Sequence, residues 1–185
     1  MISFCDKFRP DYFIDTIYDI DARWLADQGI SALIIDVDNT IMARYERQPH
    51  HKLRQWVKEL LDSGVRAVAV SNNWTERVRK IAEELEVSLL APAGKPLRPA
   101  FKRAIAQLGS SPDCTAILGD QLFTDILGGN RAGIRTVMVA PVSEIDLIHT
   151  KALRVFERII LNRLCDRRLV NGSWQSSSQE SESGR

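Results

Sequence analysis

Short apolar runs alternate with stretches of helical periodicity between residues 31 and 140, and no other feature of the 185-residue chain constrains its fold as strongly. The runs are near-continuous in apolar residues, which is typical of parallel strands covered on both faces. The predicted strands are 32–35, 67–70, 87–90, 115–118 and 136–139. The predicted helices between them lie near 51–62, 75–85, 97–108 and 123–131. Because such crossovers are right-handed, the pattern predicts an α/β fold, a three-layer, Rossmann-like sandwich around a five-stranded parallel sheet.

Both ends of the chain extend beyond this core. A first helix is predicted to begin after Asp21, a favoured N-cap residue, and to end near Gly29. A basic amphipathic helix is predicted after Pro141, over about 144–168. Residues 171–185 include six serines and one aromatic residue, so they cannot repay the entropy of ordering and are predicted to be disordered. We therefore expect one domain over 1–170, with its core at 31–140, followed by a tail.

Charge and cysteine content restrict the partners and the compartment. The chain has 25 Lys and Arg against 24 Asp and Glu, so no overall field attracts nucleic acid, and we expect no nucleic-acid partner. The three cysteines are scattered without zinc-site spacing, which favours a reducing compartment. Asp6 and Lys7 stand where a signal peptide needs apolar residues, and no apolar run reaches the ~18 residues of a membrane span. These features predict a cytoplasmic protein.

Two carboxylates directly follow the first predicted strand, in Asp36-Val37-Asp38-Asn39-Thr40. In α/β folds the carboxyl ends of the strands form the ligand site. One carboxylate can attack phosphorus and form an acyl phosphate, while the second protonates the leaving oxygen and later activates water. The motif alone also fits an Asx-type turn that ends a strand.

Further polar residues follow the later strands. Ser71 and Asn72 come after the second strand, where Ser71 can bind phosphate or cap the helix near Trp74. Lys95 precedes the predicted helix at 97–108 and can neutralise phosphate charge. Asp120 and Asp125 follow the fourth strand. Carboxylates converging at one edge repel one another unless a hard divalent ion such as Mg²⁺ lies between them.

The order D-x-D-x-T, Ser, Lys, G-D-x-x-x-x-D resembles the four motifs of the haloacid-dehalogenase-like (HAD) phosphohydrolase superfamily. The resemblance implies a nucleophile at Asp36 and a general acid/base at Asp38. It also implies that Ser71, Asn72 and Lys95 hold the transferring phosphoryl group.

The same resemblance implies a Mg²⁺ site. The ion would be bound by the Asp36 side chain, the backbone carbonyl of Asp38 and Asp120, with Thr40 and Asp125 in supporting roles. Members of this superfamily often carry an inserted cap domain. Here 30 residues separate Thr40 from Ser71 and 23 separate Ser71 from Lys95, which leaves room for one helix and its connections in each gap. The sequence therefore predicts an uncapped site, open to a large substrate or closed by a partner subunit.

Longer stretches are similar to the YqeG-type, phosphatidylglycerophosphate phosphatase-like branch of HAD subclass III. They include Phe8 to Tyr12, Val70 to Asn73, Gly119 to Asn130 and Glu157-Arg158. This similarity implies a phosphatase that converts phosphatidylglycerophosphate to phosphatidylglycerol. Gly128-Gly129-Asn130 is open to a simpler interpretation, as the end or a kink of a helix.

The predicted C-terminal helix has two interpretations of similar weight. Residues 151–168 hold six bases against Glu157 and Asp166, beside apolar residues at helical spacing. Such a helix can lie on an anionic membrane surface, as a peripheral contact on the inner face of the membrane. It can equally pack on the sheet and leave a solvated basic face.

Three alternatives to a phospholipid phosphatase stay open. A soluble phosphomonoester such as a sugar phosphate would need an oligomer to complete the pocket. A phosphoaspartate signalling receiver accepts phosphate after its third strand, where this chain has Leu90-Ala91-Pro92 and no acid. A non-catalytic membrane-binding scaffold is disfavoured because every motif position is filled.

Overall fold

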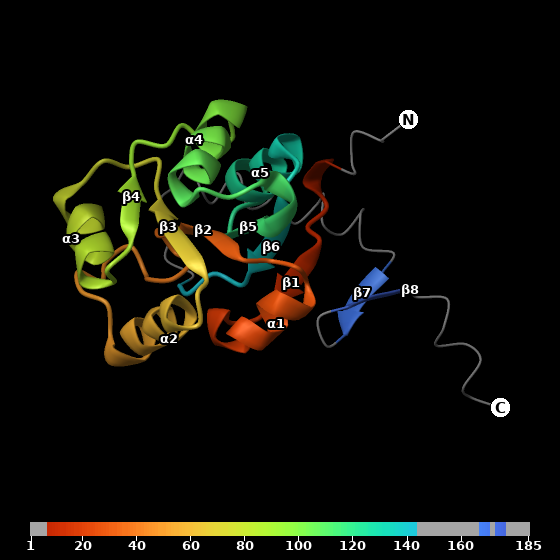
Figure 1. Cartoon of the computed structure of the whole chain (residues 1–185), viewed down its shortest axis with the longest axis horizontal. Coiled ribbons are helices and arrows are strands. Elements are labelled where there is room, and N and C mark those ends of the chain that lie inside the picture. The colour runs from red at the N-terminus through yellow and green to blue at the C-terminus, as the bar shows by residue number, and fades with distance from the viewer. Residues whose placement is uncertain (1–6, 144–166, 171–172, 177–185) are drawn as a thin grey trace.

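A six-stranded parallel sheet forms the centre of the molecule in the computed structural model, which describes residues 7–143, 167–170 and 173–176. The strand order is β1-β6-β5-β2-β3-β4 (Figure 1). The strands are β1 Tyr12–Ile14, β2 Ala32–Asp36, β3 Arg66–Val70, β4 Ser88–Leu90, β5 Thr115–Gly119 and β6 Arg135–Val139. All neighbours pair in parallel, so the strands end at one common carboxyl edge.

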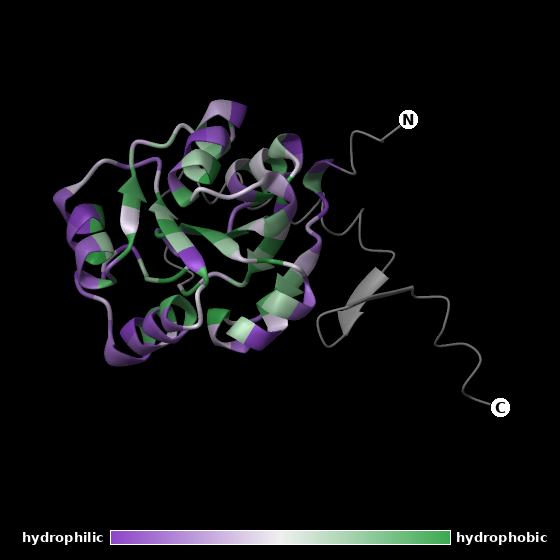
Figure 2. Cartoon of the chain, in the orientation of Figure 1, coloured by the Kyte–Doolittle hydropathy of each residue, from purple (hydrophilic) through white to green (hydrophobic). Residues whose placement is uncertain are grey.

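Helices cover both faces of this sheet. They are α1 Ala22–Asp27, α2 His51–Asp62, α3 Glu76–Glu84, α4 Arg98–Leu108 and α5 Leu127–Ala132. Alternate residues of β2 enter different cores: Leu33 and Ile35 pack with α1, α2 and α3, whereas Ala32 and Ile34 pack with α4. Figure 2 shows the hydrophobic strands enclosed between these helical layers. The predicted three-layer α/β sandwich is confirmed, and within 41–94 the described chain contains no cap domain.

The count of five strands was wrong, because β1 adds a sixth at the edge of the sheet. Its three residues stand apart from the alternating pattern of residues 31–140 that predicted the other strands. The preceding Asp11 fixes the pairing: its backbone N–H donates to the carbonyl of Thr136 at 3.0 Å, and its carboxylate accepts from the Thr136 N–H at 2.8 Å. Strand β1 thus attaches the N-terminal segment to β6.

Glycines 128 and 129 allow α5 to approach its neighbours closely. A Cβ at Gly128 would lie 2.4 Å from the ring of Phe101 on α4, and one at Gly129 would lie 2.5 Å from Ile117 on β5. The expected helix end does not lie at these residues, since both are inside α5, which ends before Gly133, whose φ is 76°. A π-helix at Leu122–Ile126 leads directly into α5.

The C-terminal region differs from expectation where it is described. Strands β7 Arg167–Val170 and β8 Ser173–Ser176 form an antiparallel pair, in place of the end of a helix and the start of a disordered tail. The sequence between them is Asn171-Gly172, the dipeptide most typical of two-residue hairpins. The predicted helix itself lies almost entirely in 144–166, outside the described residues.

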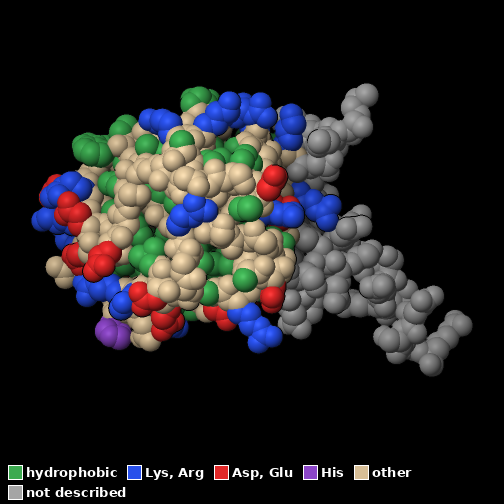
Figure 3. Space-filling view, in the orientation of Figure 1, with side chains coloured by type: hydrophobic (Ala, Val, Ile, Leu, Met, Phe, Trp, Pro, Cys, Tyr) green, Lys and Arg blue, Asp and Glu red, His purple; other side chains and the backbone are tan. Residues whose placement is uncertain are grey.

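The surface carries both signs of charge. Figure 3 shows basic and acidic side chains spread over the face in view, in keeping with the near-neutral composition. In the described part of the chain, no helix has the length and apolar character needed to cross a membrane.

Candidate active site

The predicted site residues gather at the carboxyl edge of the sheet. Asp36 is the last residue of β2 and pairs with Val70, the last residue of β3, so Ser71 begins the loop beside it. Asp120 directly follows β5. The side chains at this edge are buried although they are polar: Asp36, Asp38, Thr40, Ser71, Lys95, Asp120 and Asp125 all expose 8% or less of their surface. Buried charge of this density requires specific partners.

Lys95 joins two of the aspartates. Its Nζ lies 2.5 Å from Oδ1 of Asp36 and 2.6 Å from Oδ1 of Asp125. The Lys95 and Asp125 side chains are almost completely enclosed. This ammonium neutralises one negative charge in a site that holds three neighbouring carboxylates.

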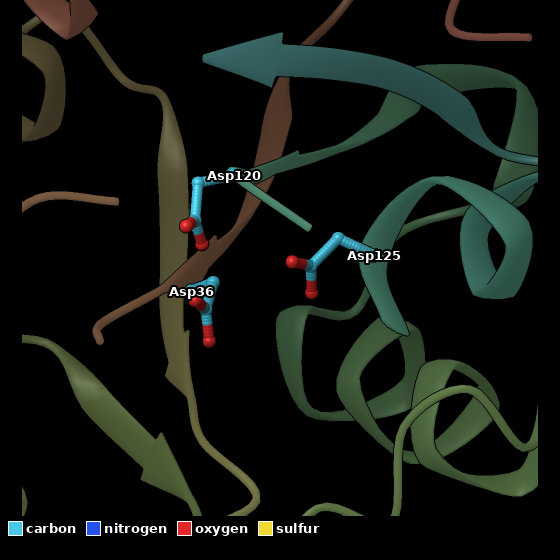
Figure 4. Close-up of side chains that lie close together, drawn as sticks. All are labelled: Asp36, Asp120 and Asp125. Atoms are coloured by element: carbon cyan, nitrogen blue, oxygen red, sulfur yellow. The ribbon is translucent and has the colours of Figure 1, made fainter. Parts of the chain in front are cut away.

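Those carboxylates belong to Asp36, Asp120 and Asp125, which each offer an oxygen within 4.8 Å of the others. Figure 4 shows the three groups facing a common space, from the end of β2, the end of β5 and the π-helix. Gly119 makes this convergence possible, because a Cβ there would lie 2.4 Å from the Asp125 carboxyl carbon. A buried set of hard oxygen donors with one compensating cation fits a divalent ion such as Mg²⁺.

Thr40 connects this group internally. Its hydroxyl lies 3.1 Å from Oδ2 of Asp36 and 3.1 Å from Oδ1 of Asp120, and it accepts the backbone N–H of Asp120 at 3.0 Å. The residue is fully buried, so water cannot replace these bonds. Thr40 therefore fixes the spacing between the loops that follow β2 and β5.

Burial and charge shift the pKa values of two of these groups upward. Burial raises the pKa of Asp36 to about 7, with a further rise from Asp125, and Lys95 only partly opposes it. Burial by itself lowers the pKa of Lys95, but the carboxylates of Asp125 and Asp36 outweigh it and raise the pKa. Lys95 thus stays charged, and the site carries surplus negative charge that a bound cation would relieve.

Asp38 lies in a separate cluster of donors. Its Oδ2 accepts from Ser71 Oγ at 3.2 Å and from Asn73 Nδ2 at 3.0 Å, and its Oδ1 accepts from Arg77 at 2.8 Å. Burial raises the pKa of Asp38, but the Asn73 hydrogen bond and the charges of Arg44 and Arg77 outweigh it and bring the pKa below its usual range. The two motif aspartates therefore differ in environment as well as in position.

Arg77 was not identified from the sequence. From α3 its guanidinium reaches Asp38 and also donates to the carbonyls of Glu46 at 2.6 Å and Ala43 at 2.8 Å. It joins α3 to the loop after β2 and holds Asp38 in place. In the sequence Arg77 cannot be told apart from Arg79 and Lys80, which are basic residues of the same helix, so nothing marked it as a site residue.

Ser71 and Asn72 have contacts that narrow their predicted functions. The helix after β3 is capped by Thr75 and not by Ser71, whose hydroxyl contacts Asp38 and the N–H of Asn73. The Asn72 side chain accepts from the N–H groups of Gly94 and Lys95, at 3.0 and 2.8 Å, and donates to the Lys95 carbonyl at 2.9 Å. The Asn72 side chain thus holds the loop that carries Lys95, and its binding to phosphate stays a prediction.

Comparison with known proteins gives a consistent set of relatives. Residues 92–141 match the family model described as HAD-hydrolase-like. The chain is 35% identical over 157 residues to the protein named probable phosphatase YqeG of Bacillus subtilis (strain 168), covering 85% of this chain and 91% of that protein.

More distant matches extend this set. The chain is 32% identical over 146 residues to phosphatidylglycerophosphate phosphatase 1, chloroplastic, of Chlamydomonas reinhardtii, which covers 72% of this chain and 53% of that protein. It therefore spans about half the length of that relative. Among solved structures, the cobalt-bound form of deoxy-D-mannose-octulosonate 8-phosphate phosphatase from Haemophilus influenzae matches with a TM-score of 0.50 and 18% identity, over 73% of this chain and 89% of that one. This likeness shows a shared fold.

Proposed function

Because the chain belongs to the HAD superfamily and is a HAD-type phosphatase, we propose that it hydrolyses a phosphomonoester through a phosphorylated Asp36. The observation that carries this proposal is the position of Asp36, buried at the end of β2 between Lys95 and Thr40. Asp38 follows two residues later in its own cluster of donors. An attacking carboxylate and a separate acid/base are what a two-step phosphoryl transfer requires.

In the first step, an Asp36 carboxylate oxygen attacks phosphorus and the bond to the ester oxygen breaks. Asp38 donates a proton to the departing oxygen, so the products are an alcohol and an aspartyl phosphate. The incoming phosphate brings negative charge close to Asp38, which raises its pKa from the low value set by Arg77 and Arg44 and favours the protonated form.

In the second step, Asp38 accepts a proton from water as that water attacks phosphorus. The bond between phosphorus and the Asp36 oxygen breaks, releasing inorganic phosphate and regenerating the carboxylate. Ser71 and Lys95 lie beside the two aspartates, where their donors can bind the phosphoryl oxygens. Asn72 contributes by holding the backbone of Lys95.

We propose Mg²⁺ as the cofactor, held by Asp36, Asp120 and the backbone carbonyl of Asp38, with Asp125 next to it. Three buried carboxylates around one lysine fit such an ion. When bound, it would neutralise charge on the nucleophile and on the transferring phosphoryl group.

As substrate we propose phosphatidylglycerophosphate, with the enzyme at the inner face of the membrane. The support is the similarity to the phosphatidylglycerophosphate phosphatase of Chlamydomonas, together with a site that no cap domain within 41–94 covers. An open site suits a phosphate presented at a surface. The predicted basic helix would add membrane contact.

Phosphate release measured with Mg²⁺ tests the proposal. The substrates are phosphatidylglycerophosphate in mixed micelles and a panel of soluble phosphomonoesters that includes sugar phosphates. We expect a preference of at least about tenfold in kcat/KM for the lipid, equivalent to roughly 1.4 kcal/mol. Asp36→Asn should lose at least about a thousandfold in kcat on every substrate, because an amide cannot attack phosphorus.

Three results would count against the proposal. A soluble ester hydrolysed faster than the lipid would keep the mechanism and replace the substrate. Near-native turnover by a folded Asp36→Asn protein, with an unchanged circular dichroism spectrum, would reject Asp36 as the nucleophile. Stable labelling of Asp36 without turnover would instead indicate a signalling receiver.

A further inference from the structure

Large hydrophobic side chains exposed in the described chain gather around the active site. They are Tyr45 and Trp74, each 66% exposed, Leu97 at 58% and Val142 at 51%. We call these four residues the active-site rim. Each lies in a different loop, and these loops follow β2, β3, β4 and β6. Since those strands are parallel, all four loops lie at the edge that carries Asp36.

The loops that carry the rim are poor in exposed acid. Between Val37 and His50 the acids are the buried Asp38 and the half-buried Glu46. The Glu46 carboxylate accepts the N–H of Ala43, and Arg44 and Arg47 are basic. The loops 71–75 and 140–143 contain no charged residue, and the loop 91–97 contains only Lys95. The four rim loops therefore present mainly apolar, amide and basic groups, whereas the loop after β1 at the same edge exposes the acids Asp15 and Asp19.

The opposite edge of the sheet carries charges of both signs. Its exposed acids include Asp27 and Asp62, the last residues of α1 and α2, and Glu86 and Asp113, which precede β4 and β5, while Arg66 and Arg135 are exposed bases. None of the large hydrophobic residues exposed in the described chain lies there. The two edges therefore differ in apolar exposure, with the active site at the apolar edge.

We propose that the active-site rim docks this edge onto an anionic phospholipid bilayer, with the Trp74 and Tyr45 rings at the level of the headgroups. The inference rests on the proposed function and specifies the surface through which the enzyme meets its substrate. Tryptophan and tyrosine favour the membrane interface, because their rings are apolar while their N–H and O–H groups stay hydrated.

Two features favour a bilayer over a second copy of the chain. The rim side chains are spread over four loops and separated by polar residues such as Asn72, Asn73 and Gln48, which suits insertion into a fluid surface better than a packed protein interface. The acid-poor loops with Arg44 and Arg47 also complement negative headgroups. In this orientation a headgroup phosphate faces Asp36 directly.

Vesicle flotation with the full-length protein tests the surface. The vesicles contain phosphatidylcholine alone or an equal mixture with phosphatidylglycerol. We expect binding to the anionic vesicles, and a loss of at least about tenfold in apparent affinity for the triple variant Tyr45→Ala/Trp74→Ala/Leu97→Ala. The matched control, Asp27→Ala/Asp62→Ala/Asp113→Ala on the opposite edge, should bind at least as well as the unchanged chain.

Two further measurements separate this inference from a folding defect and from the proposed substrate. The rim variant should hydrolyse p-nitrophenyl phosphate at an unchanged rate. In the described residues, the hydrogen bonds and ion pairs of Asp36 and Asp38 involve no rim side chain. Lipids brominated near the headgroup should quench the fluorescence of the unchanged chain, and Trp74→Phe should remove most of that quenching while the protein still binds.

The inference fails if the anionic vesicles do not bind, or if the rim variant binds them as well as the unchanged chain, whatever the rates on phosphatidylglycerophosphate. It also fails if the rim variant changes only the molecular mass in sedimentation, which would assign the rim to a second copy. Rim-dependent binding without hydrolysis of phosphatidylglycerophosphate would uphold the surface and reject the substrate.

Discussion

The hydroxyl of Thr40 connects the two loops that carry the acidic residues, since it lies 3.1 Å from both Asp36 and Asp120 and accepts the N–H of Asp120. Thr40→Val preserves the shape and removes all three interactions. We expect kcat to fall by about 10- to 100-fold and the Mg²⁺ concentration for half-maximal activity to rise.

Thr40→Ser supplies the control, because it keeps the hydroxyl and removes one methyl group. It should recover most of the activity and the native Mg²⁺ requirement. Equal losses in the valine and serine variants would show that packing, and not the hydroxyl, accounts for the effect.

At this scale, sequence reasoning found the residues whose chemistry is tied to a motif and missed those that act from a distance. Asp36, Asp38 and Lys95 could be predicted because they directly follow or precede recognisable strands and helices. Arg77 reaches Asp38 across 39 positions of sequence, a contact that only the packing of α3 against the loop after β2 creates. Asn72 was found, but its bonds to Gly94 and Lys95 depend on a loop path that residue identity does not reveal.

Among the elements, α5 approaches its neighbours too closely for any residue larger than glycine at position 128. A Cβ there would lie 2.4 Å from Phe101 and 3.2 Å from the backbone of Pro96. Gly128→Ala should therefore lower the free energy of unfolding by about 1–3 kcal/mol, measured by urea denaturation.

Phe101→Leu in the same chain tests the cause, because it removes the ring atoms that the new methyl group would strike. The double variant should lose less stability than the sum of the two single variants. If the stability losses of the two single variants simply add, the helix accommodates the methyl group by a rigid-body shift of α5.

The elements themselves could be predicted where a pattern was long enough. Helix α2 lies at the predicted 51–62, and α3 and α4 lie within one residue of the predicted ends. Strand β1 could not, because it stands apart from the 31–140 pattern and its pairing depends on Asp11 and the distant Thr136. The strands β7 and β8 were missed because the serine content of the tail outweighed the Asn-Gly signal between them.

For the whole molecule, the buried carboxylates link stability to pH. Because burial raises the pKa of Asp36 to about 7, the folded chain binds a proton there more tightly than the unfolded chain does. Stability from this group is therefore greatest in acid and falls as pH rises from about 4 to about 7. The lowered pKa of Asp38 adds no slope above about pH 5, since that group is then ionised in both states.

Thermal melts with a chelator and with Mg²⁺ check this expectation. In chelator, Tm should be higher near pH 5.5 than near pH 8, and Mg²⁺ should raise Tm near pH 8 most strongly. Activity should be lost when the chelator removes the metal. Asp36→Asn should flatten the pH dependence in chelator, and a slope that persists in this variant would place its origin elsewhere.

Asn39 stands three residues after Asp36 and, with a φ of 70°, shapes the turn that leads to Thr40. Its side chain also forms two hydrogen bonds with the backbone of Ser143, at 2.9 and 3.0 Å. Ser143, the last residue described before 144–166, is thus bonded directly to the turn that follows Asp36. A displacement of the backbone at Ser143 would therefore be transmitted to the loop that carries Asp38 and Thr40.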